Sequence, residues 1–296
     1  MGDANARILD GRTSAPTPPP QRSGPPRGRA SAARAHGVAR PRLWFEILLI
    51  AVSYWTYSLI RNAVPEQKTQ ALRNADWVWR AEHSIGIAVE HTVNHAMNAV
   101  TWLIVAMNYY YATLHFIVTV GVLVWLYRRH PGRYAASRLV LFLTTAVALL
   151  GYYFFPLAPP RLMPGGHFID TVMVHDTWGS MASGNLASMS NQYAAMPSMH
   201  IGWSLWCGLT LALLARHVWV RVLGVLYPVL TLLVIVSTAN HFWLDAVGGV
   251  LCLAFAFAVA RLWYGASLSR LPRLPRPGPA PTRPSEPSPQ TSPSGA

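Results

Sequence analysis

The chain has 296 residues, of which 52% are hydrophobic and only 12% are charged, whereas about 25% of the residues of a soluble domain are charged. This composition excludes an ordinary soluble protein, and apolar runs of about 18 residues or more indicate a polytopic membrane protein. The net charge of +13 does not predict a nucleic-acid partner, because the basic residues lie mainly in tails and short loops.

The hydrophobic runs predict six membrane-spanning helices, because a segment in lipid must satisfy its own backbone hydrogen bonds. They cover residues 43–60, 101–127, 138–156, 199–215, 221–239 and 242–263. The expected fold class is therefore all-α, a polytopic membrane helix bundle with one membrane domain over residues 43–263. Residues 1–42 and 264–296 are rich in Pro with Arg or Ser, which predicts disordered tails.

Two further segments are not predicted to cross the membrane. Residues 66–100 mix charged residues with apolar ones such as Trp77 and Ile85, which predicts one or two amphipathic helices on the outer surface. Residues 157–197 contain several prolines and the pair Gly165-Gly166, which predicts an irregular loop. A loop of this length between helices is often functional.

The distribution of basic residues predicts the orientation of the helices. Arg128, Arg129 and Arg133 follow the second predicted span, and both tails are basic, whereas Arg161 is the single basic residue of the loop 157–197. Because basic segments stay in the cytoplasm, both tails are predicted to be cytoplasmic and the long loop to face outward. We therefore expect a multi-pass protein of the plasma membrane with an outward-facing site.

Two histidines lie at the N-terminal ends of apolar runs. His200 begins the fourth predicted span, His241 begins the sixth and Arg161 follows the third, so all three are expected at one membrane face. An ionisable residue at this depth is a functional-site hypothesis by default. Asp245 follows His241 by one helical turn, where a carboxylate can accept the imidazole N–H and orient a base. The alternative is a histidine that merely packs at a helix end.

Two features near these histidines suit a phosphate group. Pro197 and Ser198 predict a helix start capped by Ser198, and the free N–H groups of a helix start favour an anion beside His200. The planar fork of Arg161 matches two phosphate oxygens. The alternative for Arg161 is that it snorkels to lipid headgroups.

Other polar residues are given more ordinary roles. Glu46 in the first span is expected to snorkel or to pair, and Asn108 and His115 in the second are expected to hydrogen-bond between helices. The tyrosines 109–111 are predicted to be interfacial anchors or to line a groove for lipid entry. Polar residues of the outer loop are expected to line the entrance or to contact a headgroup: His167, Asp170, His175 and Asp176.

The segment Ala195-Met196-Pro197-Ser198-Met199-His200, followed downstream by His241-x-x-x-Asp245, resembles the type 2 phosphatidic acid phosphatase superfamily. With Pro159-Pro160-Arg161 and the outer amphipathic segment, the chain is similar more narrowly to the inositol phosphotransferase branch, of the aureobasidin-resistance type. The likeness covers roughly residues 43–263. This chain departs from the pattern at several positions. In the first motif Phe154 stands in place of a lysine and Leu162 in place of a proline; in the third motif Ser237-Thr238 stands where the family has a Ser-Arg pair, and Asn240 stands in place of a histidine of the branch.

The resemblance implies a metal-independent phosphatase or phosphotransferase without a cofactor, acting on a lipid phosphate ester. His241 would be the nucleophile and form a phosphohistidine, Asp245 would orient it, and His200 would protonate the leaving group. Arg161 and Ser198 would bind the substrate phosphate. Two alternatives remain open: a metal-dependent membrane enzyme with histidine and aspartate ligands, and a transporter or catalytically inactive lipid-binding scaffold. The sequence does not indicate the oligomeric state.

Overall fold

The computed structural model describes residues 42–63, 67–165, 167–177 and 192–271. The described residues are largely helical and contain no strand; Leu157 and Ala194 form an isolated β-bridge. The prediction of an all-α fold is therefore confirmed. Residues 1–41 and 272–296 of the predicted tails lie outside the described residues; residues 264–271 are described, and Leu268 among them is buried against the helices.

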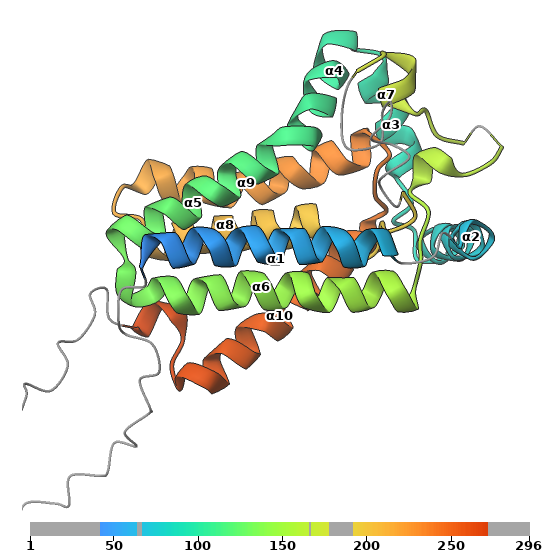
Figure 1. The fold of residues 1–296 in the computed structure, drawn as a ribbon. Helices are drawn as coiled ribbons and strands as arrows, with labels where there is room; N and C mark the ends of the chain where they lie inside the picture. Colours follow the sequence, from blue (N-terminus) through green and yellow to red (C-terminus); the bar gives the residue numbers. More distant parts are fainter. Residues whose placement is uncertain (1–41, 64–66, 166, 178–191, 272–296) are drawn as a thin grey trace, which may run out of the picture. The chain divides into compact units, whose positions relative to one another are not determined.

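The long helices follow the apolar runs of the sequence (Figure 1). They are α1 (Leu43–Ala63), α4 (Thr101–Tyr109) continued through a π-helical segment (Tyr110–Leu114) into α5 (His115–Arg129), α6 (Pro131–Phe154), α8 (Met199–Leu214), α9 (Val218–Ser237) and α10 (Trp243–Tyr264). The shorter elements are α2 (Lys68–Ser84), α3 (Glu90–Asn98), a 3₁₀ turn (Pro160–Leu162), α7 (Thr171–Val174) and a second 3₁₀ turn (Leu268–Arg270).

In the described part of the chain, four helical stretches are long and apolar enough to cross a membrane: Thr101–Arg129, Pro131–Phe154, Val218–Ser237 and Trp243–Arg270. The first and fourth predicted spans contain shorter apolar helices, Leu43–Thr56 and Met199–Leu214. The predicted start of the third span at residue 138 was wrong, because α6 already begins at Pro131. Proline fits the first helical position, where its missing N–H would have no partner in any case.

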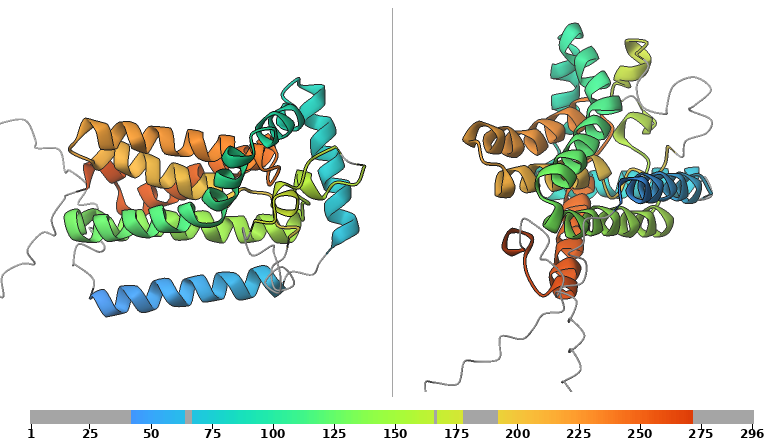
Figure 2. Two further views of the ribbon diagram at one scale, coloured as in Figure 1. Left: turned by 90° about the horizontal axis from the view of Figure 1, so that it is seen from above. Right: turned by 60° about the vertical axis from the view of Figure 1, so that its left-hand side comes forward.

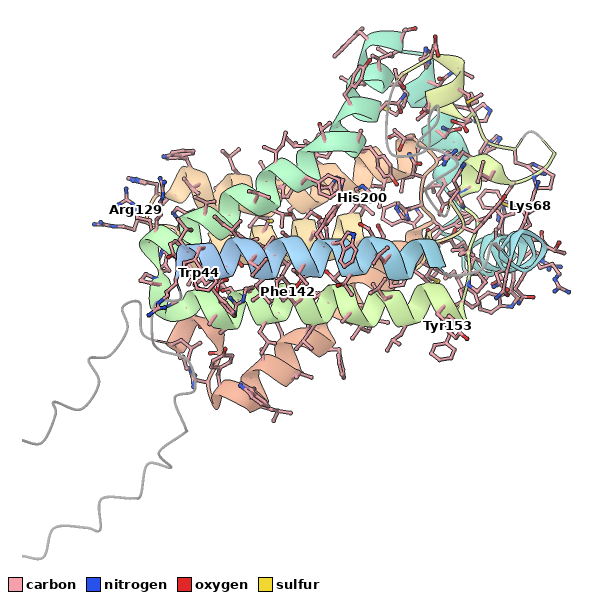
Figure 3. All side chains as sticks on the ribbon, in the orientation of Figure 1. Trp44, Lys68, Arg129, Phe142, Tyr153 and His200 are labelled. Carbon is pink, nitrogen blue, oxygen red and sulfur yellow. The ribbon has the colours of Figure 1, made fainter. Side chains whose placement is uncertain are left out.

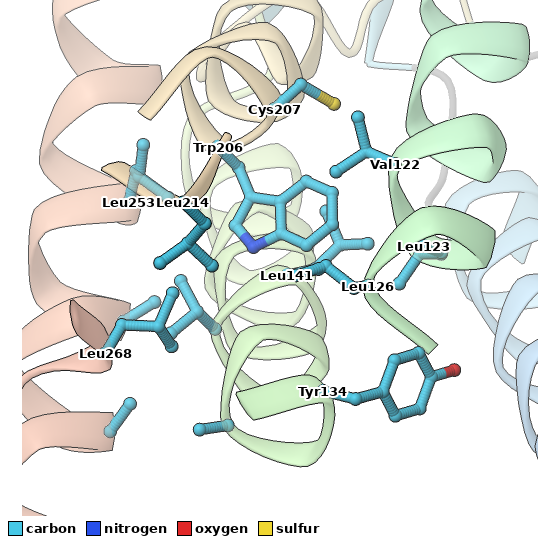
Figure 4. Packing of buried hydrophobic residues seen from close by; sticks show 14 residues of the cluster. Val122, Leu123, Leu126, Tyr134, Leu141, Trp206, Cys207, Leu214, Leu253 and Leu268 are labelled. Carbon is cyan, nitrogen blue, oxygen red and sulfur yellow. The ribbon is translucent and has the colours of Figure 1, made fainter. Parts of the chain in front are cut away.

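Helix α8 lies at the centre of the bundle and packs against α9, α10, α5 and α6 (Figures 1 and 2). Its Trp206 is fully buried in a cluster with Val122, Leu141 and Leu253 from the surrounding helices (Figure 4). The indole N–H donates a hydrogen bond to the Ser137 carbonyl at 2.9 Å. Helix α8 is thus enclosed by the other helices, which fixes the position of its N-terminus.

Glycines allow the helices around α8 to approach closely. A Cβ atom on Gly249 of α10 would overlap with the carbonyl oxygen of Ser198, and one on Gly208 of α8 would overlap with that of Gly224 in α9. Small residues at such contacts let helix backbones touch, which is how helices commonly associate in membranes. The contact at Gly249 brings the start of α10 beside the start of α8.

The helix ends fall into two groups. Figures 1 and 3 show the end of α6, which carries Tyr153, and the start of α10 at the end of the bundle where α2 lies; the end of α5, at Arg129, is at the opposite end. His200 lies between Lys68 of α2 and Arg129 (Figure 3). The end of α6 and the start of α10, which were expected at one membrane face, therefore lie at the same end of the bundle. That this face is the outer one stays a prediction.

The segment before α4 forms two amphipathic helices, within the one or two that we expected. Helix α2 buries Ala71, Ala75 and Val78 against a cluster that includes Leu157 and Phe242. Trp77, on the other side of α2, is exposed. The apolar face of α2 therefore covers the chain just before α10 and is not directed only at lipid.

The polar residues of the first two predicted spans have definite partners. Glu46 pairs with Arg138 of α6 and accepts a hydrogen bond from the Tyr134 hydroxyl, which confirms the paired alternative. The amide of Asn108 donates to the Thr171 carbonyl at 3.0 Å, between α4 and α7 as predicted. For His115 the prediction was wrong: its Nδ1 bonds the Tyr111 carbonyl, which lies one turn earlier in the same helical stretch, within the π-helical segment.

Candidate active site

His241 and Asp245 are held together by the start of α10. The helix begins at Trp243, so His241 lies in the segment before it, not on its surface. Oδ2 of Asp245 lies 3.2 Å from His241 Nδ1 and accepts the Phe242 N–H at 3.0 Å. The predicted contact is present, but the helical periodicity that we invoked is not its cause. Asp245 caps the helix through its side chain and reaches His241 with the same oxygen.

His200 lies across from His241. It is the second residue of α8, and the centroids of the two imidazole rings are 5.6 Å apart, within the span of ~4–7 Å that would let both rings reach one phosphate. Tyr111 stacks on His200 with a centroid distance of 4.1 Å and an interplanar angle of 18°. The Tyr111 carbonyl accepts a hydrogen bond from His200 Nε2–H at 3.3 Å.

Tyr111 owes its position to the π-helical segment Tyr110–Leu114. An inserted π turn shifts the side chains and carbonyls of a helix from their regular positions, and such turns are frequent at functional sites. Sequence reasoning assigned the tyrosines 109–111 to anchoring or to a lipid groove and missed the contact with His200. Nothing in the pattern of the second apolar run marks the π turn.

Arg161 is bound to the segment that precedes His241. Its backbone N–H donates to the Ala239 carbonyl at 3.0 Å and its Nε–H to Oδ1 of Asn240 at 3.0 Å. It forms an ion pair with Asp170 at 3.0 Å, and its side chain is 8% exposed. Snorkelling would require an extended, exposed side chain. The Arg161 side chain is instead largely buried beside the segment that carries His241, with Asp170 on its guanidinium.

Ser198 occupies the N-cap position of α8, as predicted, but its hydroxyl forms no cap hydrogen bond. Its backbone N–H donates to the Asp245 carbonyl at 2.9 Å, and its carbonyl contacts Gly249. The backbone therefore holds the residue in place, and the prediction of a side-chain cap was wrong. Its Oγ is fully buried and has no hydrogen-bond partner.

These residues lie within residues 76–259, which match the PAP2 superfamily. The chain belongs to this superfamily. Membership indicates a phosphatase-type activity, and it supports the superfamily resemblance inferred from the motifs without reaching the inositol phosphotransferase branch. No curated protein and no solved structure matches the chain.

One departure of this PAP2 protein from the motif pattern has a clear structural setting. Phe154, at the position of the motif's lysine, is 76% exposed at the last residue of α6. Its side chain therefore does not replace the lysine in the site. Asn240, another departure, accepts the hydrogen bond from Arg161 and donates to Thr238 Oγ1 at 2.8 Å. It links the arginine to the segment that carries His241.

Two buried carboxyl groups near His241 were missed by sequence reasoning. The Trp243 N–H donates to Glu90 Oε1 at 3.1 Å, and the Leu244 N–H donates to Glu82 Oε1 at 2.8 Å. In the sequence analysis, both glutamates were treated only as part of the mixed charge of the amphipathic segment 66–100. No spacing in the sequence links them to residues so distant along the chain, and only the packing of α2 and α3 reveals the contact.

The alternative of a metal-dependent PAP2 protein required a cluster of ligands. In the ranges that the structure describes, no group of three or more histidine, cysteine, aspartate or glutamate side chains is arranged to hold a metal ion. The buried cysteines Cys207 and Cys252 are both free thiols, in α8 and α10. The positive groups brought to this site are the Arg161 guanidinium and the N–H groups at the start of α8.

Proposed function

We propose that this PAP2 protein is an integral membrane phosphatase or phosphotransferase that acts on a lipid phosphate ester through a phosphohistidine at His241. One observation carries the proposal: His241 Nδ1 lies 3.2 Å from a fully buried Asp245, and the His241 ring lies 5.6 Å from that of His200. A base, its orienting carboxylate and a second histidine thus meet at one point, as acyl- and phosphoryl-transfer sites require.

In the first half-reaction, Nε2 of His241 attacks the phosphorus atom. Because Asp245 accepts the hydrogen bond of Nδ1–H, the lone pair is on Nε2 and is free to attack. A P–N bond forms and the P–O bond of the ester breaks. Protonated His200 gives its proton to the departing oxygen, and Asp245 stabilises the positive charge that develops on the His241 ring.

In the second half-reaction, neutral His200 takes a proton from an acceptor hydroxyl. The acceptor oxygen attacks phosphorus, the P–N bond breaks and the electron pair returns to His241 Nε2. Water as acceptor releases free phosphate from a monoester, or a phosphate monoester from a diester, which makes the protein a phosphatase. An alcohol as acceptor carries away the phosphoryl group of a monoester, or the phosphate that still bears the second ester group of a diester, which makes it a phosphotransferase.

The phosphate would bind between Arg161 and the start of α8. Arg161 offers a planar pair of donors, and Ser198 offers a buried hydroxyl with no partner in the protein. Asp170 already neutralises part of the Arg161 charge at 3.0 Å. This balance favours a phosphodiester, whose phosphate carries one negative charge, over a monoester that carries nearly two. It supports an activity of the inositol phosphotransferase type.

The site would open at the outer face of the plasma membrane, with both tails in the cytoplasm. Basic residues at the opposite end of the bundle, such as Arg128 and Arg129 at the end of α5, support this orientation. A site at the interface depth suits a lipid, because the headgroup presents its phosphate there. A lipid phosphate and the membrane itself are therefore the proposed partners.

The proposal is tested with purified protein in liposomes that contain phosphatidic acid, a polyprenyl phosphate or phosphatidylinositol, with a lipid alcohol as acceptor. His241→Ala is expected to lower turnover by about 10³-fold or more, whereas His217→Ala, at the exposed start of α9, is expected to have no effect. Retained turnover in His241→Ala would contradict the proposal. Free phosphate or a phosphorylated alcohol among the products decides between phosphatase and phosphotransferase, and loss of activity in EDTA would favour the metal-dependent alternative.

The second candidate is a transporter or a catalytically inactive lipid-binding scaffold. The exposure of Phe154 and the pairing of Arg161 with Asp170 favour it, because both weaken the binding of a phosphate. Lipid flux in proteoliposomes that survives loss of both His200 and His241 would support this candidate. Flux that disappears together with turnover would exclude it.

A further inference from the structure

The first N–H groups of α10 are each bound by a different carboxyl group. Asp245 accepts from Phe242, Glu90 of α3 accepts from Trp243 and Glu82 of α2 accepts from Leu244. All three carboxyl groups are fully buried. Helices α2 and α3, which are distant from α10 in the sequence, thus contact the start of α10. His241 lies just before this helix start.

The two glutamates cannot both be charged without a large cost. Oε2 of Glu82 and Oε2 of Glu90 are buried and have no hydrogen-bond partner when both groups are treated as acceptors. A proton on one carboxyl group satisfies both oxygens, because it lets one group donate to the other. Burial and the neighbouring Glu90 raise the pKa of Glu82 to about 9, so the proton is retained at neutral pH.

We propose that Glu82 and Glu90 share one proton and are positioning residues that hold the start of α10, and with it the His241 ring. The consequence for catalysis rests on the proposed function of His241. His241 lies outside the helix, and its position depends on the carboxyl groups that fix the next three residues. A singly charged pair suits the positive end of the helix dipole, whereas a doubly charged pair beside Asp245 would repel.

The charged groups that face Glu82 come from two other elements. Glu90 on α3 and Asp245 on α10 both act to keep its proton in place, and the Leu244 N–H acts against them. His241 lies beyond Asp245, to which its Nδ1 is bonded. Loss of the shared proton would therefore place a third negative charge beside this histidine.

The shared proton makes stability fall as the pH rises. The pKa of Glu82 is raised from 4.5 to about 9 on folding, so its contribution is fully present below 4.5 and is lost as the pH rises through about 9. The unfolding temperature is therefore expected to decline between about pH 4.5 and about pH 9. Turnover is expected to fall only as the pH approaches about 9, where the folded protein loses the shared proton and the start of α10 loosens.

The test uses the full-length protein with Glu82→Gln, Glu82→Ala and, as a control, Asp76→Asn. A glutamine at residue 82 can accept from Leu244 and donate to Glu90 without a titrating proton. Glu82→Gln should keep the kcat of the unsubstituted protein within about threefold at neutral pH, whereas Glu82→Ala should lower kcat by about 10-fold or more with little change in KM. Asp76 is exposed on the same helix and should change neither quantity.

Two measurements without substrate test the shared proton of Glu82 and Glu90 independently of the proposed phosphohistidine at His241. Infrared spectra at neutral pH should show a protonated carboxyl band that is present in Asp76→Asn and lost in Glu82→Gln. The alkaline decline of the unfolding temperature should also flatten in Glu82→Gln. A band that persists in Glu82→Gln, an unchanged alkaline decline, or a kcat as low as that of Glu82→Ala would overturn the proposal. The infrared spectra and the unfolding temperatures test the shared proton even if His241 is not the nucleophile.

Discussion

Oδ2 of Asp245 lies 3.2 Å from Nδ1 of His241 and, at the same time, accepts the Phe242 N–H at 3.0 Å. One oxygen therefore fixes both the start of α10 and the tautomer of the imidazole ring. The two tasks separate in a variant that keeps the cap and loses the charge, because an amide oxygen can still accept from a backbone N–H.

Asp245→Asn is expected to lower kcat by about 10³- to 10⁴-fold, as loss of the orienting carboxylate does in other histidine-based sites. The amide oxygen can still accept from the Phe242 N–H and from His241 Nδ1–H, but the negative charge that stabilises the positive charge developing on the His241 ring is lost. The unfolding temperature should change little. Turnover assays and thermal unfolding in detergent check both expectations, and a kcat within about tenfold of the unsubstituted protein would contradict this role of Asp245.

Arg161→Lys keeps the charge but not the planar fork that contacts Asn240 and Asp170. We expect kcat/KM to fall by about 10²-fold, because an ammonium group cannot bond two phosphate oxygens in one plane. Arg80→Lys, on the exposed side of α2, serves as the control. Equal kcat/KM values for Arg161→Lys and Arg80→Lys would exclude bidentate phosphate binding by Arg161.

Tyr111 is expected to act through its ring and its backbone and not through its hydroxyl. Tyr111→Phe keeps the stack on His200 and the carbonyl that accepts from it, so turnover should stay within about twofold. Tyr111→Ala removes the ring and should lower turnover by up to about tenfold. Steady-state kinetics of both variants decide the matter: a loss in Tyr111→Phe as large as in Tyr111→Ala would assign the role to the hydroxyl.

Gly249→Ala is expected to destabilise the bundle by about 1–3 kcal/mol, because the added methyl group meets the Ser198 carbonyl and forces α10 away from α8. Activity should fall with it, since this contact sets the distance between the segments of His200 and His241. Gly121→Ala in α5 is the matched control, because a Cβ atom there has nothing within 4 Å. Chemical unfolding in detergent should separate the two variants, and equal stabilities would contradict the close helix contact.

The long helices could be predicted from the sequence because their cause is local. A run of apolar residues in lipid has few backbone alternatives to a helix, so α4 to α6, α9 and α10 follow directly from the sequence. The pairing of His241 with Asp245 was also predicted, but its cause differs: His241 precedes α10, and Asp245 reaches it because its side chain folds back over the start of the helix. The proximity of His200 to His241 was inferred from the basic residues in the loops, which place the starts of both spans at one membrane face. The distance of 5.6 Å between the two ring centroids agrees with this inference.

The remaining contacts depend on packing between distant segments. Glu82 and Glu90 reach α10 only because α2 and α3 fold back over its start, and no periodicity encodes that approach. The contact of Tyr111 with His200 depends on a π turn that leaves no mark in the sequence. The Ser198 hydroxyl was expected to cap α8, but the backbone contacts of that residue with Asp245 and Gly249 already hold the helix start.

Whether His241 forms a phosphohistidine can be measured by trapping the covalent intermediate. The protein in liposomes is mixed with a lipid whose phosphate is isotopically labelled, quenched at alkaline pH, where phosphohistidine survives, and mapped by mass spectrometry. We expect label on His241, accumulation of that label in a His200→Ala variant that forms the intermediate and discharges it slowly, and no label in His241→Ala. Label on any other residue, or full turnover in His241→Ala, would contradict this expectation.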